Sequence, residues 1–347
     1  MPPRIMVVGA GRMGALRASD LAPLVDDLFI VNRSPEPARA VAREHGATAV
    51  PLAEALDVEV DAYVVATATA AHGDLLRELL PLGRPILCEK PIGATLGETE
   101  EIIEAARAHH CRIQVGFQRR FDPEFARARE LVSAGEVGTL YSVRILSHDH
   151  LPSEPDFIAS SGGIFRDLHV HDFDLVRWLT GSSIETVYAT SAVRQFTRYA
   201  DHDDADVTSI QLVTTSGVQV SVSGARHDPR GHDVRMEVFG SEDSLAAGLD
   251  AHTPLRPLGT PTVGPPTIGS DPWSGFVPRF REAFRREASA FVAHVRGEIT
   301  NPSPPDAALE STRVAIACEL SVQRGGPVTV AEVLGDHAPA SPDGRGR

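Results

Sequence analysis

The stretch Ile5-Met6-Val7-Val8-Gly9-Ala10-Gly11-Arg12-Met13-Gly14 decides the fold of the first part of this chain. A short apolar run leads into G-x-G-x-x-G, and a helical pattern follows, which is typical of the first unit of a dinucleotide-binding domain. The first glycine permits the tight turn, the second lets the backbone approach a pyrophosphate, and the third lets helix and strand pack closely. N–H groups at the start of the helix bind the phosphates, so we predict cofactor contacts at Gly9, Gly11, Arg12, Met13 and Gly14.

Apolar strands and helices keep alternating up to about residue 121. Further strands are predicted at Leu28–Val31, Ala62–Val65, Ile86–Cys88 and Ile113–Val115, and helices at Pro35–His45, His72–Leu80 and Thr95–Ala108. Continuous apolar strands between helices indicate a parallel sheet that is buried on both faces. Residues 1–121 are therefore predicted to form a Rossmann domain with a doubly wound parallel sheet.

The pattern changes after Phe121. Strands with alternating polarity are predicted at Leu140–Leu146, Thr186–Ala192, Val207–Thr214, Gln219–Ser223 and Val234–Phe239, and helices at Phe125–Ala134, Asp167–Leu179, Arg279–Arg296 and Pro305–Gln323. This order indicates a C-terminal α+β domain, residues 122–334, with a large, mainly antiparallel open sheet. The overall fold class is thus α/β with this second domain, and residues 335–347 are expected to be a disordered tail.

Composition excludes several classes of function. Among 347 residues, 33 are Lys or Arg and 47 are Asp or Glu, so the net charge is −14, and no basic surface is available for nucleic acid. No apolar run is long enough to span a bilayer, which argues against a membrane protein. The three cysteines, Cys88, Cys111 and Cys318, are few and far apart, which suits a reducing cytoplasm.

The residues after the second strand bear on the choice of cofactor. Asn32-Arg33-Ser34 stands where NAD sites usually carry an acidic residue for the ribose 2′-hydroxyl. Asn32 brings no charge to repel a 2′-phosphate, and Arg33 and Ser34 could bind one. We expect NAD or NADP as the cofactor, with NADP slightly favoured. The alternative is that Asn32 holds an NAD ribose and that Arg33 is only solvated.

Glu89-Lys90-Pro91 follows the strand Ile86–Cys88. Ligands of doubly wound sheets bind beyond the carboxyl ends of the strands, so Lys90 is expected near the nicotinamide. Its ammonium could orient a hydroxyl and stabilise developing alkoxide charge. A lysine at a strand end can equally be a solvated charge.

Asp167 and His171 are four residues apart in a predicted helix, so they would share one face. Imidazole is the usual base near neutral pH, and a neighbouring carboxylate can fix its tautomer. A capped, partly buried His–Asp pair is the alternative without function. A metal site built from His148, His150, His169 and His171 is disfavoured, because residues two apart point to different faces of a helix.

These three motifs, in this order, resemble the Gfo/Idh/MocA oxidoreductase family, and within it the inositol 2-dehydrogenases. Residues 113–122 and 171–179 also carry this resemblance. It implies an NAD(P)-dependent enzyme that oxidises a ring hydroxyl of a polyol, with Lys90, Asp167 and His171 as the catalytic set. It places Glu89 with the cofactor, and Thr67, Ala68 and His72 beside the nicotinamide. The expected substrate contacts are Gln118, Arg119, His148, His150, Asp174 and His232.

The resemblance is not complete. Inositol dehydrogenases commonly have Met where Gln118 stands, Asn near His150, Tyr near His232 and Asp at Asn32. Added polar groups change which hydroxyls a pocket accepts, so another cyclitol, a pyranose or a keto-sugar is an open alternative substrate. A non-catalytic dinucleotide-binding sensor is the alternative from another class. The open sheet suggests a homo-oligomer, a dimer or a tetramer.

Overall fold

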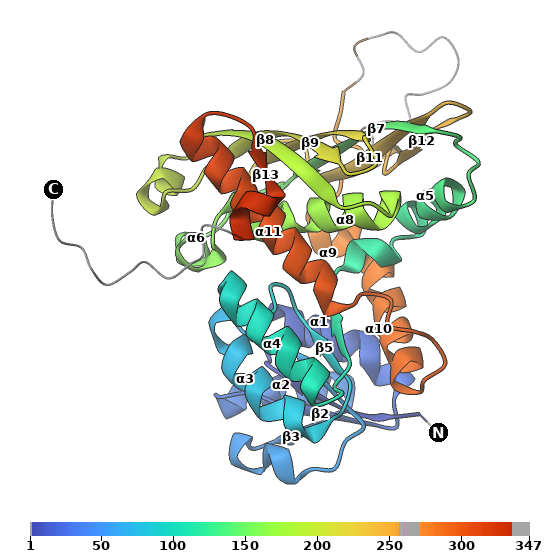
Figure 1. Ribbon diagram of the computed structural model, residues 1–347. Coiled ribbons are helices and arrows are strands. Elements are labelled where there is room, and N and C mark those ends of the chain that lie inside the picture. The colour runs from blue at the N-terminus through green and yellow to red at the C-terminus, as the bar shows by residue number, and fades with distance from the viewer. Residues whose placement is uncertain (1, 257, 259–268, 270, 335–347) are drawn as a thin grey trace, which may run out of the picture. The chain divides into compact units, whose positions relative to one another are not determined.

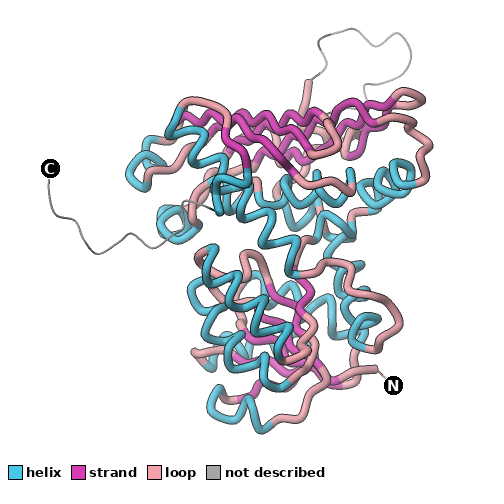
Figure 2. The backbone as a smooth tube through the Cα atoms, in the orientation of Figure 1, coloured by secondary structure: helices cyan, strands magenta, loops and turns pink. Residues whose placement is uncertain are grey.

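The computed structural model describes residues 2–256, 258, 269 and 271–334. Its chain divides into two compact units (Figures 1 and 2). Unit 1 comprises Met1–Ala126 and Val277–Glu310, and unit 2 comprises Arg127–Phe276 and Ser311–Arg347. The tail expected at 335–347 lies outside the described residues.

Unit 1 contains a six-stranded parallel sheet in the order β3-β2-β1-β4-β5-β6. Its strands are β1 (Arg4–Val8), β2 (Asp27–Val31), β3 (Thr48–Val50), β4 (Ala62–Val65), β5 (Ile86–Cys88) and β6 (Ile113–Val115). The order reverses at β1, so right-handed crossovers place the early and the late helices on opposite faces. These helices are α1 (Arg12–Leu21), α2 (Pro35–His45), α3 (His72–Leu79) and α4 (Leu96–Ala108). The predicted Rossmann sheet is confirmed.

A late segment of the chain completes unit 1. Helix α10 (Arg281–Val295), which follows the short α9 (Phe276–Arg279), buries Ala288, Phe291 and Val292 against the core formed by α1, α2 and the sheet. We expected residues 122–334 to form one domain, whereas Val277–Glu310 packs in unit 1. The physical reason is the apolar face of α10, which joins the same buried cluster as α1, α2 and the strands of this sheet.

Unit 2 contains a seven-stranded mixed sheet in the order β12-β11-β7-β10-β9-β8-β13. Its strands are β7 (Leu140–His148), β8 (Ile184–Ala192), β9 (Val207–Thr214), β10 (Gln219–Ala225), β11 (Asp233–Gly240), β12 (Ser244–Ala247) and β13 (Val328–Thr329). Only the β7–β10 pair is parallel among these described strands. The expected mainly antiparallel sheet is thereby confirmed.

Helices line one face of this sheet. They include α5 (Pro123–Ser133), α6 (Pro155–Ser161), α7 (Ile164–Asp167), α8 (Val170–Thr180) and α11 (Pro305–Arg324). In Figure 1, α8 and α11 run along one side of the strands, and no described helix covers the other side. The helix predicted over Asp167–Leu179 is in fact two, because the chain turns at Leu168 and His169 between α7 and α8.

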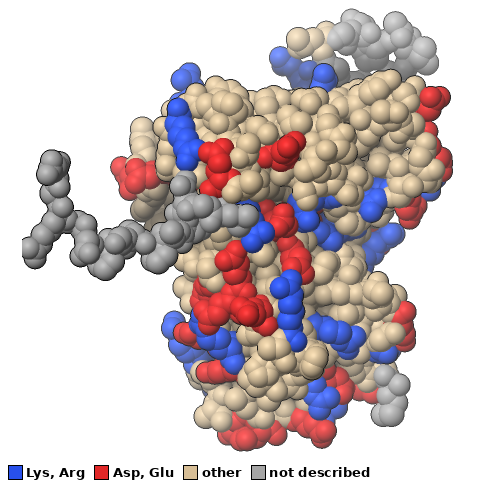
Figure 3. Space-filling view, viewed as in Figure 1, with Lys and Arg blue, Asp and Glu red and all other residues tan. Residues whose placement is uncertain are grey.

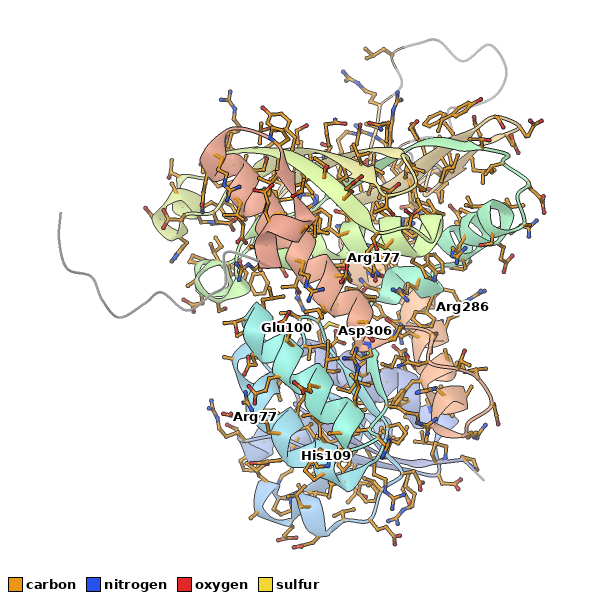
Figure 4. The ribbon with its side chains drawn as sticks, viewed as in Figure 1. Arg77, Glu100, His109, Arg177, Arg286 and Asp306 are labelled. Carbon is orange, nitrogen blue, oxygen red and sulfur yellow. The ribbon has the colours of Figure 1, made fainter. Side chains whose placement is uncertain are left out.

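Surface charge in unit 1 is arranged in local ion pairs. Figure 3 shows acidic side chains gathered over α4. Arg77 of α3, labelled in Figure 4, pairs with Glu98 and Glu101 of α4 at 3.4 and 3.0 Å. Exposed pairs of this kind contribute roughly 0–1 kcal/mol each. No helix among the described residues is both long and apolar enough to cross a membrane.

Candidate active site

The glycine turn of unit 1 is packed as a dinucleotide site requires. Gly9 has φ +109°, and its N–H donates to the Val31 carbonyl at 2.8 Å. A side chain on Gly9 would meet the carbonyl of Ala66, and one on Gly14 would fall on the carbonyl of Gly9. Gly11 caps α1 without a side-chain hydrogen bond, and the space where its Cβ would stand is open. The residues present therefore fit a dinucleotide: two glycines make the turn, and Gly11 leaves room for the pyrophosphate.

Replacing Gly11 by alanine tests this division of roles. Its φ of −79° and ψ of −167° suit alanine, and the fold has room for the methyl group. We expect the melting temperature to stay within about 2 °C of the original, while the Kd for NAD rises about tenfold or more because the methyl group takes the place of a phosphate. Gly97→Ala on α4, where the space is also open, is the matched control. Equal NAD affinity in both variants would contradict the assignment of the turn.

Asn32 after β2 is held by backbone groups. Its Oδ1 accepts from the N–H of Ala10 at 3.1 Å, and its Nδ2 donates to the Ser34 carbonyl at 2.9 Å. The side chain thus ties the glycine turn to the end of β2. Arg33 and Ser34 are exposed beside it, so this edge offers a cation and a hydroxyl.

The residues expected beside the nicotinamide follow β4 and β5. Both strands are adjacent in the sheet, so Thr67, Ala68 and Lys90 lie at the same edge as the glycine turn. Thr67 is half-buried and Ala68 is exposed. Lys90 is the only lysine in the sequence, since the other 32 of the 33 basic residues are arginines. His72 and Glu89 are buried and have partners inside unit 1, which were not foreseen from the sequence.

Glu89 belongs to a buried ion-pair network. Its Oε1 accepts from Arg17 Nε of α1 at 2.7 Å, and Arg17 Nη1 lies 2.5 Å from Glu287 Oε2 of α10. Arg17 and Glu287 are fully buried. Burial raises the pKa of Glu287 to about 7, although the charge of Arg17 acts in the opposite direction. One buried guanidinium therefore pairs with two carboxylates.

This network predicts a pH dependence of stability. The pKa of Glu287 is about 7 in the folded state against an ordinary 4.5, so its stabilisation is complete below pH 4.5 and is lost as the pH rises towards 7. Over this window the free energy of unfolding should fall by an amount on the order of 3 kcal/mol. Glu287→Gln should remove this part of the slope in urea denaturation curves, and Glu104→Gln on the surface of α4 should not. Identical slopes in the original protein and Glu287→Gln would refute the assignment.

Gln118 and Arg119 belong to the short helix after β6, Gln118–Phe121. Both are buried, and the Arg119 guanidinium lies 5.8 Å from the ring centre of Phe280. They were predicted as substrate contacts, and they belong to unit 1.

In unit 2, Asp167 ends α7 and is paired with a buried arginine. Its Oδ2 accepts from Arg226 Nη1 at 2.7 Å, and Arg226 is only 2% exposed. Arg226 also faces Asp149 at 3.8 Å and Asp204 at 3.9 Å. A guanidinium in this position keeps the Asp167 carboxylate in a fixed direction. His171 and Asp174, on α8, are buried.

The start of α8 is anchored to the sheet by a buried network. His169 Nδ1 is 2.7 Å from Asp172 Oδ2, and His169 Nε2 is 2.6 Å from Thr208 Oγ1 of β9. Ser147 of β7 donates to the other Asp172 oxygen at 2.7 Å. The first turn of α8, which carries His171, is therefore rigid. His169 has a structural role, because both of its ring nitrogens are hydrogen-bonded.

Of the three remaining predicted substrate contacts, His232 lies near Asp149, whereas His148 and His150 lie near Asp228. His232 is buried with Nδ1 3.6 Å from Asp149 Oδ1, which places it beside Arg226 and Asp167. His148 alternates with Ser147 along β7, so it points to the face of the sheet away from α8. There it lies 3.3 Å from Ser223 Oγ, and burial lowers its pKa although Asp228 opposes this. His150 Nδ1 is 3.0 Å from the Asp228 carbonyl.

The structure adds residues that the sequence did not indicate: Arg226 and Asp149 in unit 2, and Arg17 and Glu287 in unit 1. Asp149 lies between His148 and His150 in the sequence, so its place beside two predicted site residues could have indicated it. Arg226, Arg17 and Glu287 each bind side chains that are distant along the chain, so no local pattern indicates them. Among the described residues, no group of three or more His, Cys, Asp or Glu side chains is arranged to hold a metal ion.

A parallel sheet with a fitted glycine turn, and with a lysine at another strand end on the same edge, is the arrangement of a dinucleotide-dependent oxidoreductase. Two family models match the chain: the oxidoreductase family with an NAD-binding Rossmann fold over residues 3–117, and the GFO/IDH/MocA C-terminal domain over residues 125–246. The chain belongs to the Gfo/Idh/MocA family and is an NAD-dependent dehydrogenase. The resemblance in the sequence is thereby confirmed.

Relatives cover nearly the whole chain. It is 35% identical to the myo-inositol dehydrogenase Hyg17 of Streptomyces leeuwenhoekii, over 92% of this chain and 96% of that one. It is 32% identical to the scyllo-inositol 2-dehydrogenase (NAD(+)) of Bacillus subtilis strain 168, over 94% and 95%. The crystal structure of a myo-inositol dehydrogenase from Corynebacterium glutamicum matches with a TM-score of 0.85 and 32% identity, over 95% and 99% of the two chains.

Proposed function

We propose that this dehydrogenase oxidises a ring hydroxyl of an inositol to the ketone. The observation that carries the proposal is the position of the sole lysine, Lys90, at the carboxyl end of β5, on the same edge of the sheet as the fitted glycine turn after β1. A second support is that relatives covering more than nine-tenths of the chain are named inositol dehydrogenases. NAD supplies the acceptor for the hydride that leaves the reacting carbon.

Three residues divide the proton chemistry. Lys90 donates a hydrogen bond to the reacting oxygen and stabilises negative charge as it develops there. His171 accepts the hydroxyl proton as general base. Asp167, directed by Arg226 at 2.7 Å, supports the positive charge that forms on the imidazole. Gln118, Arg119, Asp174, His150 and His232 are proposed as contacts of the other hydroxyls, whereas His148, which was also expected as a contact, lies on the face of the sheet away from α8 and is withdrawn.

Initial rates of nicotinamide reduction with myo-inositol and scyllo-inositol, each with NAD and with NADP, test the reaction. A clear rate with either inositol establishes it. A rate only with a pyranose would support the second candidate, a sugar dehydrogenase. The observation that favours this candidate is the buried His232 beside Asp149. A change of polar group at this position changes which substrate hydroxyls the pocket accepts. Cofactor binding without turnover on any polyol would support the sensor.

NADP is proposed as an accepted cofactor alongside NAD. The support is the exposed pair Arg33 and Ser34 beside an Asn32 that is engaged by backbone groups. We expect Arg33→Ala to lower kcat/KM for NADP about tenfold, because one charge-assisted phosphate contact is lost, and to leave NAD kinetics nearly unchanged. Arg39→Ala, further along the exposed side of α2, is the control. A preference for NAD together with unchanged NADP kinetics in Arg33→Ala would refute this proposal.

We further propose a homotetramer or homodimer that works in the cytoplasm. The sheet of unit 2 has a face without a described helix, and a second copy would cover it. Cys88, Cys111 and Cys318 are free and buried, which suits a reducing compartment. Light scattering of the purified protein gives the number of subunits.

A further inference from the structure

The backbone around Lys90 is held on both sides by buried side chains of unit 1. On the N-terminal side, the Glu89 carboxylate is bound by Arg17 at 2.7 Å, and the Glu89 N–H donates to the Val65 carbonyl of β4 at 2.9 Å. On the C-terminal side, the Pro91 carbonyl accepts from the ring of His72. Lys90 itself is half-buried between these two anchors.

The anchor on the N-terminal side is rigid. Arg17 is fully buried, its guanidinium lies 5.2 Å from the ring centre of Phe284, and its second carboxylate partner is Glu287. A Cβ on Gly116 would stand 2.8 Å from Glu89 Oε2, so the carboxylate packs directly against the backbone of Gly116. Glu89 is thus held by α1, α10 and the end of β6 together.

The anchor on the C-terminal side joins two strand ends. His72 is 1% exposed and begins α3. Its Nδ1 lies 2.8 Å from the Pro91 carbonyl oxygen, and its Nε2 lies 3.1 Å from the Thr67 carbonyl oxygen. One imidazole therefore contacts the segment after β4 and the segment after β5, and with a single N–H on the neutral ring it donates to the Pro91 carbonyl, which is at the shorter distance.

We propose that Glu89, through Arg17, and His72 are positioning residues that aim the Lys90 ammonium at the reacting oxygen. This inference rests on the proposed role of Lys90 and replaces the expectation that Glu89 and His72 contact the cofactor. A long, flexible lysine side chain needs a fixed backbone, because misplacement by about 1 Å can lower a rate about a hundredfold. Arg17 also links this backbone to α10, which belongs to the last part of the chain.

Because Lys90 is the only lysine, it can be observed without turnover. Reductive methylation with ¹³C-formaldehyde labels Lys90 and the N-terminal amine only, and the Lys90→Ala variant identifies which signal is which. In Glu89→Gln and in His72→Gln we expect the Lys90 methyl signal to move towards that of an unfolded chain and to narrow. Glu104→Gln, which exchanges the same groups on the surface of α4, should leave the signal in place. An unmoved signal in both Glu89→Gln and His72→Gln would overturn the proposal.

Kinetics supply the second test. Each positioning variant should lower kcat about tenfold or more, with the Kd for NAD changed less than about threefold. In a Lys90→Ala background the same substitutions should have no further effect on kcat, because they act through Lys90. Additive losses would show that Glu89 and His72 act independently of Lys90 and would refute the inference. Absence of turnover in the original protein would refute the proposed reaction, whereas the NMR experiment would still decide the positioning.

Discussion

Replacement of Lys90 by alanine is expected to lower kcat about 10²- to 10³-fold, the range found when one preorganised donor to a developing oxyanion is removed. The glycine turn, which we propose as the phosphate-binding part of the site, lies on a different strand end from Lys90. NAD affinity should therefore change little. Fluorescence titration with NADH, beside steady-state rates with an inositol, measures both quantities.

Lys90→Arg provides a sharper form of this test. Arginine keeps the charge but replaces a compact ammonium with a broad, planar guanidinium. We expect it to restore little of the lost rate, because the same space must also admit a ring hydroxyl. A variant that loses NAD binding together with turnover would show that Lys90 has been placed in the wrong part of the site.

Local patterns were enough for most of the fold. Helix α2 and strands β4, β5 and β6 have the predicted bounds, because continuous apolar runs between turn residues identify buried strands. β3 was missed because it is a half-exposed strand of three residues that pairs only with β2. The break between α7 and α8 was missed as well. His169 lies at this break, and its ring bonds to Thr208, 39 residues away, a tertiary contact that no local pattern contains.

The residues of the candidate site also divide into those that belong to a local motif and those that are recognised only by contacts between distant parts of the chain. The glycine turn and Lys90 could be found because each is a local motif at a strand end. Arg17 and Arg226 could not, since each is one of 32 arginines and contacts its partners across 72, 270 and 59 residues of sequence. Glu89 and His72 were expected beside the cofactor, and we propose a positioning role for them instead, for a related reason. Their sequence positions are at the cofactor edge, but their side chains turn into the protein.

Replacement of His171 by alanine is expected to lower kcat by about 10²- to 10⁴-fold, the usual contribution of a general base. The acidic limb of the pH profile of kcat/KM should also flatten, because the group whose deprotonation it reports is gone. The fold should persist, since the start of α8 is held by His169, Asp172, Thr208 and Ser147. Steady-state rates over a range of pH and a thermal melt check these outcomes together.

Variants of two other histidines serve as controls that distinguish a loss of catalysis from a loss of stability. His169→Ala removes a buried ring and the partner of Asp172 Oδ2, so we expect a loss of about 3–5 kcal/mol in unfolding free energy. His109→Ala, at the exposed end of α4 (Figure 4), should change neither quantity. If His171→Ala behaved like His169→Ala, with lost stability and an unchanged pH profile in the surviving protein, the ring would be structural. If it lost only turnover, Asp167 and Arg226 would become the next positions to test, because their ion pair directs the carboxylate that we propose as the support of the base.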